Sequence, residues 1–450
     1  MRAPRPASGE AALDGRGATR VAPRSHVIAL TTLLLTYLAL ASGYQAATRA
    51  WDNPDEPAHF NYVRQVAETG SLPVLQAGDW DGALLERLKS TRFPPTESID
   101  AIRYESWQPP LYYVLAAPVY AAAPPAARLA WLRFLDVLLG AGTLVAAYGV
   151  GRALFGAADW RAVALPTTLV GIPMFTAMSA ALTNDALANL LATVATWVSL
   201  LAVRSARPRR LALVLGVVLG AGLLTKLTLL VFLPIGTTAA AWGASRIGGR
   251  GAAVRASGTV VGIAVGAWLP WLVRNALTYG WNDPLASRRH DLVVAEQARF
   301  PGFTFEHLSY LAATTFHSFW AQFGWMAFPV DDRLYGVWGA FAIAGCVGLV
   351  WAAIGTGRGR LLHLAPWFVT AATVVGMLAA LGYYNLTYIQ AQGRYLFPAG
   401  AGLAGFAVLG WARLGGRYGG PVALGTAAAL VVLNVLTLYR WASPALAGPP

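Results

Sequence analysis

Apolar runs of about the length needed to cross a bilayer recur along the sequence, and this recurrence limits the folds open to the chain. A transmembrane helix takes roughly 20 predominantly apolar residues. Only 12% of the residues are charged and 56% are hydrophobic, which leaves too few charges to wet the surface of a soluble domain. The eleven runs are 26–46, 129–150, 162–182, 186–203, 211–225, 227–242, 258–273, 334–354, 361–381, 396–411 and 421–438. The sequence therefore predicts an all-α integral membrane protein with about eleven transmembrane helices.

The distribution of arginine predicts the orientation of these helices. Cytoplasmic segments of membrane proteins carry an excess of Lys and Arg. If the N-terminus is inside, every inner segment carries at least two arginines, and Glu10, Asp14 and Asp159 are the inner acids. The net charge of +13 is then a topology signal. Nucleic-acid binding is not expected, because the arginines cluster between apolar runs and not on one soluble face.

The chain divides into three predicted parts. Residues 1–25 are polar and rich in Arg, Gly and Pro, which predicts a disordered cytoplasmic N-terminus. Residues 26–440 form the predicted membrane domain, and residues 441–450 form a short C-terminal tail. A cleavable signal peptide is the alternative interpretation of the run 26–46, because small residues follow it. We expect this run to be retained as the first transmembrane span, because the orientation of the later spans requires the chain to leave it on the outer side of the membrane.

Two long loops, 47–128 and 274–333, fall on the outer side of this topology, whereas the other connections are short. Their apolar stretches 109–123 and 305–328 contain prolines, tyrosines and tryptophans, which suit pieces that lie in the interface or re-enter the membrane. Sizeable loops on one side of a bundle favour a functional site there. We therefore expect the chemistry on the extracytoplasmic side of the cell membrane.

The segment after the first run has the pattern of a capped helix. Asp52 or Asn53 can cap it, Pro54 suits its first turn, and Gly70 suits its end. This predicts an ordered helix directly outside the membrane.

Asp55 and Glu56 begin this helix, and Asp55, His59 and Tyr62 share one of its faces at i, i+4 and i+7. A carboxylate and an imidazole thus point the same way, as an acid–base site requires. The alternative is that the two acids only complement the helix dipole. A divalent cation held by Asp55 and His59, with Asp185, is also open, although two ligands at one spacing are weak evidence for a metal.

Further polar residues fall at outer turns between apolar runs. Asn184 and Asp185 lie where the third run meets the fourth, and Lys226 lies between the fifth and the sixth. An ionisable residue near membrane depth indicates a functional site. The alternatives are a helix cap for Asp185 and snorkelling to lipid phosphate for Lys226.

Arg394 lies at the outer mouth of the tenth run, between Gln392 and Tyr395 and directly after Gly393. A fixed guanidinium at headgroup depth suits a phosphate group, either of a substrate or of an ordinary lipid. Arg274, at the end of the seventh run, has a similar position. These residues are candidates for binding a phosphorylated ligand.

Other features indicate structure or exclude chemistry. Arg133 and Asp136, at i and i+3 in the second run, are expected to neutralise each other. Cys346 is the one cysteine, so an intramolecular disulfide is excluded. No Walker A loop, Rossmann glycine pattern, HExxH or nucleophile elbow occurs, and we expect no nucleotide cofactor.

These motifs resemble, in their order and sidedness, the GT-C glycosyltransferases, which use lipid-phosphate-linked sugars and include the protein O-mannosyltransferases and the lipid A aminoarabinose transferase. Asp55-Glu56 resembles the catalytic motif of the superfamily, WQPPLYY at 107–113 its second juxtamembrane segment, and Asn184-Asp185 its second outer acid. The segments 318–325 and 392–398 are similar to a bacterial membrane-protein branch called domain of unknown function 2142. One departure is Gln108-Pro109, where some relatives have Lys-Pro.

The resemblance implies a GT-C-like bundle with extracytoplasmic juxtamembrane helices, which moves a sugar from a polyprenyl phosphate to an acceptor hydroxyl with inversion. In this interpretation Asp55 is the general base, and Glu56 and His59 hold the carboxylate and the acceptor. Arg394, with Lys226 or Arg274, offsets charge on the leaving phosphate. The other implied substrate-binding residues are Trp107, Gln108, Asn184, Asp185, Gln392 and Tyr395.

The implied partners are a polyprenyl-phosphate-linked sugar, membrane lipids, and a glycan, lipid or protein acceptor. Two other functions stay open at this point. The chain could be a transporter or flippase of a lipid-linked sugar, which would use the same arginines but needs access from the inner face. It could also be a non-catalytic scaffold of an envelope-glycan assembly complex.

Overall fold

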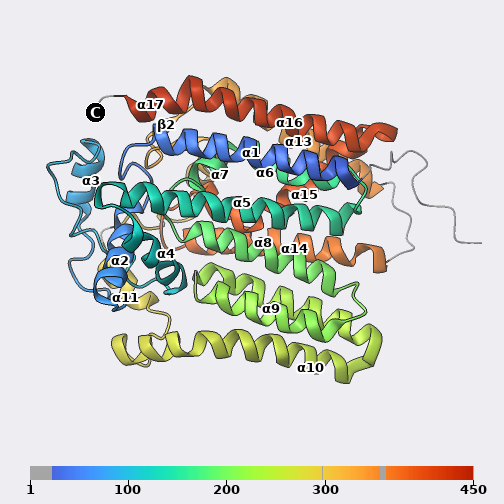
Figure 1. The fold of residues 1–450 in the computed structure, drawn as a ribbon, viewed down its shortest axis with the longest axis horizontal. Helices are drawn as coiled ribbons and strands as arrows, with labels where there is room; N and C mark the ends of the chain where they lie inside the picture. The colour runs from blue at the N-terminus through green and yellow to red at the C-terminus, as the bar shows by residue number, and fades with distance from the viewer. Residues whose placement is uncertain (1–22, 296, 355–360, 449–450) are drawn as a thin grey trace, which may run out of the picture.

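A computed structural model of the protein describes residues 23–295, 297–354 and 361–448, and it is a bundle of long helices with short elements gathered at one end (Figure 1). Within these described ranges, eight helices are long and apolar enough to cross a membrane. They are Arg24–Ala47, Pro125–Phe155, Asp185–Ala202, Leu227–Tyr279, Asp332–Ile354, Leu364–Asn385, Gly393–Leu414 and Gly416–Ala447. The predicted all-α membrane class is confirmed, whereas the predicted number of eleven spans is not.

Three local features account for the difference in number. Helix α10 (Phe232–Tyr279) consists of two helices that meet at a kink, where Gly248 and Gly249 have non-helical dihedral angles. Run 258–273 and all but the first five residues of run 227–242 therefore fall within one continuous element. Pro173 begins a new helix after Gly171, which divides the run 162–182 into α6 (Arg161–Val170) and α7 (Pro173–Met178). Helix α9 (Pro208–Leu223) has only 16 residues. The position of the apolar segments is thus predicted from composition more accurately than the number of spans.

The remaining long helices pack around two large apolar clusters. They are α1 (Pro23–Ala47), α5 (Arg128–Phe155), α8 (Asp185–Ala202), α13 (Asp332–Ile354), α14 (Leu361–Asn385), α15 (Gly400–Leu414) and α16 (Gly419–Thr437). Helices α13 and α15 touch backbone to backbone, because a Cβ atom at Gly348 or at Gly410 would collide with a carbonyl group of the other helix. Close approach through small residues is a common way to pack helices in membranes.

One end of the bundle, which we call the loop end, carries the short elements of both long loops. In Figure 1, α2, α3, α4, α11, β2 and α17 all lie at this end, on the left of the view. The elements here are α2 (Glu56–Thr69), α3 (Gly82–Ser90), α4 (Leu111–Ala122), α11 (Ser287–Val293), α12 (Phe305–Trp320), β1 (Gln322–Phe323), β2 (Phe328–Pro329) and α17 (Ser443–Ala447). The strands form one antiparallel pair, in which Gln322 faces Pro329. The 3₁₀ segments η2 (Leu227–Val231) and η3 (Gly393–Ala399) complete the surroundings of the predicted site.

Candidate active site

Asp55 occupies the N-cap position of α2, with a left-handed backbone at φ 66° and ψ −5°. The prediction that Asp52 or Asn53 caps this helix is wrong. The carboxylate of Asp52 instead accepts hydrogen bonds from Arg92, and the amide of Asn53 donates to Glu56 Oε1 at 3.2 Å. A left-handed conformation costs a non-glycine residue about 1–3 kcal/mol, and aspartate is among the residues that adopt it most readily.

Both carboxylate oxygens of Asp55 have partners. Tyr104 donates its hydroxyl to Oδ1 at 2.8 Å, and Arg394 donates Nη2 to Oδ2. Burial alone would raise the pKa of Asp55, but the positive charge of Arg394 and its hydrogen bonds outweigh burial, and the pKa lies below its ordinary value. Asp55 is therefore an ionised carboxylate at neutral pH.

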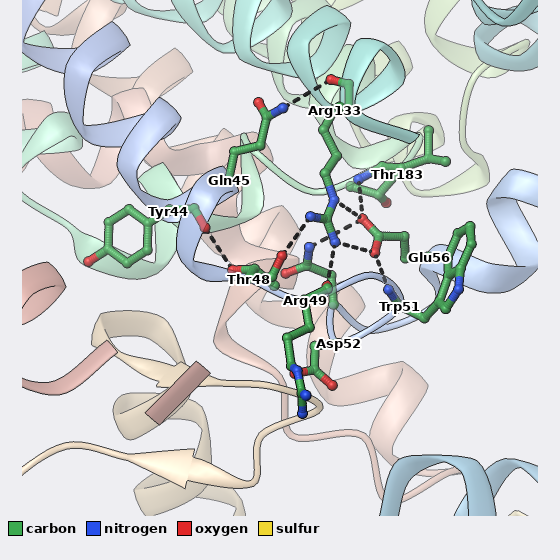
Figure 2. A network of polar contacts seen from close by, with 12 residues as sticks. Tyr44, Gln45, Thr48, Arg49, Trp51, Asp52, Glu56, Arg133 and Thr183 are labelled. Carbon is green, nitrogen blue, oxygen red and sulfur yellow. Dashed lines mark hydrogen bonds and ion pairs between the residues drawn. The ribbon is translucent and has the colours of Figure 1, made fainter. Parts of the chain in front are cut away.

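Glu56, the neighbouring acid, belongs to a separate buried network (Figure 2). Arg133 donates Nε to Oε1 at 2.7 Å and Nη2 to Oε2 at 2.6 Å, and the backbone amides of Trp51 and Leu182 also donate to this carboxylate. Arg133 further donates to the carbonyl of Thr48 at 2.8 Å. A carboxylate with this many donors is fixed in place, so the geometry supports a structural role for Glu56, and its catalytic role stays a prediction.

The predicted pairing of Arg133 with Asp136 is wrong for the same reason. Asp136 instead accepts hydrogen bonds from the hydroxyl of Tyr112 at 2.9 Å and from the amide of Thr183 at 2.8 Å. The two residues are near in sequence, but each side chain finds better partners on other elements. Each oxygen of Glu56 accepts a hydrogen bond from a different nitrogen of the Arg133 guanidinium, which is the bidentate pairing that arginine prefers.

His59 is buried one turn into α2. Its Nδ1 is 2.9 Å from the hydroxyl of Tyr113, and its Nε2 is 3.4 Å from Thr183 Oγ1. Burial lowers the pKa of His59 to about 4, although the charge of Asp55 acts in the opposite direction. Tyr62, on the same face, stacks on Tyr113 with ring centroids 3.5 Å apart. His59 is thus a neutral residue that lines the site next to Asp55.

The second predicted acid forms an ion pair near Arg394. Lys226, just before η2, pairs with Asp185 at the start of α8. Asn184 donates Nδ2 to Gln108 Oε1 and to the carbonyl of Thr225, both at 3.3 Å. The first turn of α8, the turn before η2 and the 107–113 segment are therefore connected by hydrogen bonds.

Arg394 is 4% exposed and lies where the chain enters the tenth predicted span. The amide of Gly393 donates to Ser318 Oγ at 2.8 Å, and a Cβ atom at Gly393 would collide with the backbone of Phe319 in α12. Glycine is thus required for the close approach that aims Arg394 at Asp55. The Nε and Nη1 atoms of Arg394 are buried and have no hydrogen-bond partner among the residues that the structure describes. Two free donors remain beside Tyr395, whose ring centroid lies 5.4 Å from the guanidinium.

Three predicted residues lie outside this cluster or at its edge. Arg274 donates to the carbonyl of Pro73 and, at 3.0 Å, to Asn275 Oδ1, so its charge is used to hold the first long loop. Gln392 donates Nε2 to Gln390 Oε1 at 2.7 Å. Trp107 packs against the ring of His290, with centroids 4.7 Å apart.

The sequence analysis missed Glu105 and Tyr104. Burial, together with the negative charge of Asp55, raises the pKa of Glu105 to about 7. Its Oε2 is buried and has no hydrogen-bond partner in the described part of the chain. The one indication in the sequence that these two residues belong to the site was their position just before Trp107. Nothing local in the sequence marks them as buried.

The geometry gives no support to a metal site at Asp55, His59 and Asp185. Throughout residues 23–295, 297–354 and 361–448, no three His, Cys, Asp or Glu side chains are arranged to hold a metal ion. Asp55 and Asp185 are instead paired with cations.

An apolar groove of about 540 Å³ adjoins the position of Arg394. Its lining includes Leu396, two residues after the arginine, and Thr315 and Phe319, whose backbone Gly393 touches. Leu381 and Asn385 of α14 line the other side. An apolar groove lined by residues next to Arg394 in sequence and in contact with Gly393 is suited to the hydrocarbon chain of a lipid whose anionic head group reaches the guanidinium.

Comparison with known proteins gives one family match and several structural ones. Residues 108–271 match the family model described as dolichyl-phosphate-mannose-protein mannosyltransferase. The fold is similar to ArnT from Cupriavidus metallidurans bound to undecaprenyl phosphate, with 16% identity, a TM-score of 0.50, and coverage of 95% of this chain and 74% of that one. No curated protein sequence matches the chain.

A second similar structure is the oligosaccharyltransferase AglB from Archaeoglobus fulgidus in complex with an inhibitory peptide and a dolichol-phosphate. The identity is 14%, the TM-score is 0.52, and the match covers 95% of this chain. It covers 56% of the archaeal chain, so this protein spans just over half the length of that enzyme. These likenesses confirm the predicted GT-C fold, while the narrower bacterial branch stays a prediction.

Proposed function

We propose that this protein, whose fold is similar to that of the solved membrane glycosyltransferases, moves a sugar from a polyprenyl phosphate to an acceptor hydroxyl with inversion at the anomeric carbon. The observation that carries the proposal is the pair of Asp55 and Arg394. A half-buried carboxylate is paired with a buried guanidinium, two of whose nitrogens have no hydrogen-bond partner among the described residues, and an apolar groove begins two residues further along the chain at Leu396. The solved relatives that contain undecaprenyl phosphate or dolichol-phosphate support a donor of this class.

In the proposed reaction Asp55 takes the proton of the acceptor hydroxyl as the acceptor oxygen attacks the anomeric carbon. The bond between that carbon and the phosphate oxygen breaks, and the polyprenyl phosphate leaves with the electron pair. Each oxygen of Asp55 has accepted one hydrogen bond and retains a second lone pair for the acceptor. A positioned general base contributes about 10²–10⁴-fold to such a step.

Arg394 stabilises the charge that develops on the leaving phosphate. Its Nε and Nη1 are available for phosphate oxygens, and a preorganised buried cation acts most strongly where water is excluded. Lys226 lies near Arg394, with its ammonium 6.0 Å from the ring centroid of Tyr395, and supplies a second positive charge. The polyprenyl chain lies in the groove lined by Phe319 and Leu396.

We place this site on the extracytoplasmic side of the cell membrane. Asp55 and the elements of both long loops lie at the loop end of the bundle (Figure 1). Arg209, Arg210 and Arg246 fall in segments that the positive-inside rule assigns to the cytoplasm. Donor and acceptor would then meet outside the cell, in the envelope.

The test is transfer by the purified protein in liposomes. The donors are undecaprenyl phosphates that carry a radiolabelled hexose, and the acceptor is an envelope fraction from cells that lack the protein. Asp55→Asn is expected to reduce transfer at least about 100-fold. Asp100→Asn is the matched control, because Asp100 pairs with Arg64 on the exposed surface. Equal transfer by wild type and Asp55→Asn would contradict the proposal, and so would movement of the lipid across the liposome with no transfer.

A further inference from the structure

Glu105 is a half-buried acid, with a fully buried Oε2 atom, that the proposed mechanism does not use. It lies in the turn 103–108, which is closed by hydrogen bonds from the Ser106 amide to the Arg103 carbonyl at 2.9 Å and from the Gln108 amide to the Glu105 carbonyl at 3.0 Å. The preceding residue, Tyr104, contacts Asp55 directly. The same turn that fixes Asp55 thus places a second carboxyl group in the site.

This carboxyl group lacks a cation of its own. Arg394 pairs with Asp55, and Lys226 pairs with Asp185. Glu105 interacts with both cations only at longer range, and Gln108 is its hydrogen-bonding neighbour. The Oε2 atom has no partner in the described structure, although a buried carboxyl oxygen is costly to leave unpaired. Such an atom is suited to a hydrogen-bond donor that arrives with a ligand.

Two further buried polar atoms without partners belong to the same connected group. Asn184 is joined to Glu105 through Gln108, and its Oδ1 accepts no hydrogen bond from the described residues. Trp107, in the turn itself, has a buried Nε1 with no described acceptor. Two acceptors and one donor of this kind match the hydroxyl groups of a sugar, each of which both donates and accepts.

We propose that Glu105 accepts a hydrogen bond from a hydroxyl group of the sugar that is transferred, and so determines which sugar-bearing lipid the enzyme binds. This inference rests on the proposed function, since it assigns the sugar subsite of the same reaction. Asn184 Oδ1 and Trp107 Nε1 provide the remaining contacts. Arg394 holds the phosphate of the same donor.

Aromatic rings near Glu105 suit the apolar faces of a sugar. Tyr384 interacts electrostatically with Glu105, and its ring meets that of Tyr395 edge-on with centroids 6.0 Å apart. Trp107, in the same turn as Glu105, packs on the ring of His290. Amphipathic rings of this kind combine an apolar body with a polar edge.

The inference is tested by binding, without the need for a known acceptor. Purified protein in detergent is titrated with undecaprenyl phosphate, either bare or carrying mannose, glucose or galactose. Glu105→Gln is expected to weaken binding of the preferred sugar-bearing lipid about tenfold or more, because a charged acceptor is lost, and to leave binding of the bare lipid unchanged. Glu86→Gln is the control, since Glu86 is an exposed acid on α3. It should change neither affinity.

The pH dependence gives a second measurement. With a pKa of about 7, Glu105 gains its negative charge between pH 6 and pH 8, so the preference for the sugar-bearing lipid should increase over that range in the wild type and stay flat in Glu105→Gln. An equal loss of both affinities, or no loss of either, would overturn the inference while the proposed function stands. Failure of the wild type to bind any of these lipids would instead contradict the proposed function, and the inference would fall with it.

Discussion

The guanidinium of Arg394 pairs with the carboxylate of Asp55 across 339 residues of sequence. Each residue is fixed by a different device. Asp55 has a left-handed backbone at the start of α2 and also accepts a hydrogen bond from Tyr104, whereas the absence of a side chain at Gly393 lets η3 pack directly against α12. The proposed base and the proposed phosphate ligand therefore hold each other in place before substrate arrives.

Replacement of Arg394 should change the pH dependence of transfer. The charge of Arg394 opposes burial and keeps the pKa of Asp55 low, so Arg394→Gln removes the opposing effect and the pKa rises. A base works only when deprotonated, and the acidic limb of kcat/KM should therefore move to higher pH. Transfer rates between pH 4 and pH 8 measure this shift, and an unmoved limb in a folded Arg394→Gln variant would argue against Asp55 as the base.

Loss of the Glu56 charge should destabilise the protein severely. Glu56→Gln leaves Arg133 buried beside a neutral partner, and breaking a buried pair costs about 3–5 kcal/mol. The control is Glu97→Gln, because the Arg87–Glu97 pair is exposed and such a pair contributes at most about 1 kcal/mol. Thermal unfolding in detergent compares the two. A similar, small decrease in Tm for both variants would show that the network of Figure 2 does not support the start of α2.

These two predictions concern side chains whose interaction partners could not be predicted from the sequence. Apolar runs are a local property, so the helical segments could be located from composition alone. Burial depends on what other segments cover, and Glu105 therefore looked like any loop acid. The predicted partner of Arg133 was wrong because the spacing along one helix favoured Asp136. In the structure α2 instead brings Glu56 into a bidentate geometry with Arg133. Asp55, Asp185 and Arg394 could be predicted together because all three lie where apolar runs end.

The neutrality of His59 predicts a loss of stability in acid. Its pKa is about 4 in the folded protein and 6.5 in an unfolded chain, so the unfolded state binds the additional proton between these values. Stability should therefore fall as the pH decreases from 6.5 to 4, by about 3 kcal/mol for this residue. The measurement is Tm against pH for wild type and His59→Gln. Parallel curves for the two proteins would contradict a buried neutral His59.

The sidedness of the site can be tested by chemical labelling of intact cells. Cys346 is replaced by serine, and a single cysteine is introduced either at Glu86 on α3, which lies at the loop end (Figure 1), or at Arg209 at the start of α9. Both positions are exposed in the structure. A maleimide that cannot cross membranes should label Glu86→Cys in intact cells and Arg209→Cys only after permeabilisation, because arginine-rich segments stay in the cytoplasm. The reverse pattern would place Asp55 and Arg394 on the cytoplasmic face, and the proposed transfer to an envelope acceptor would then be excluded.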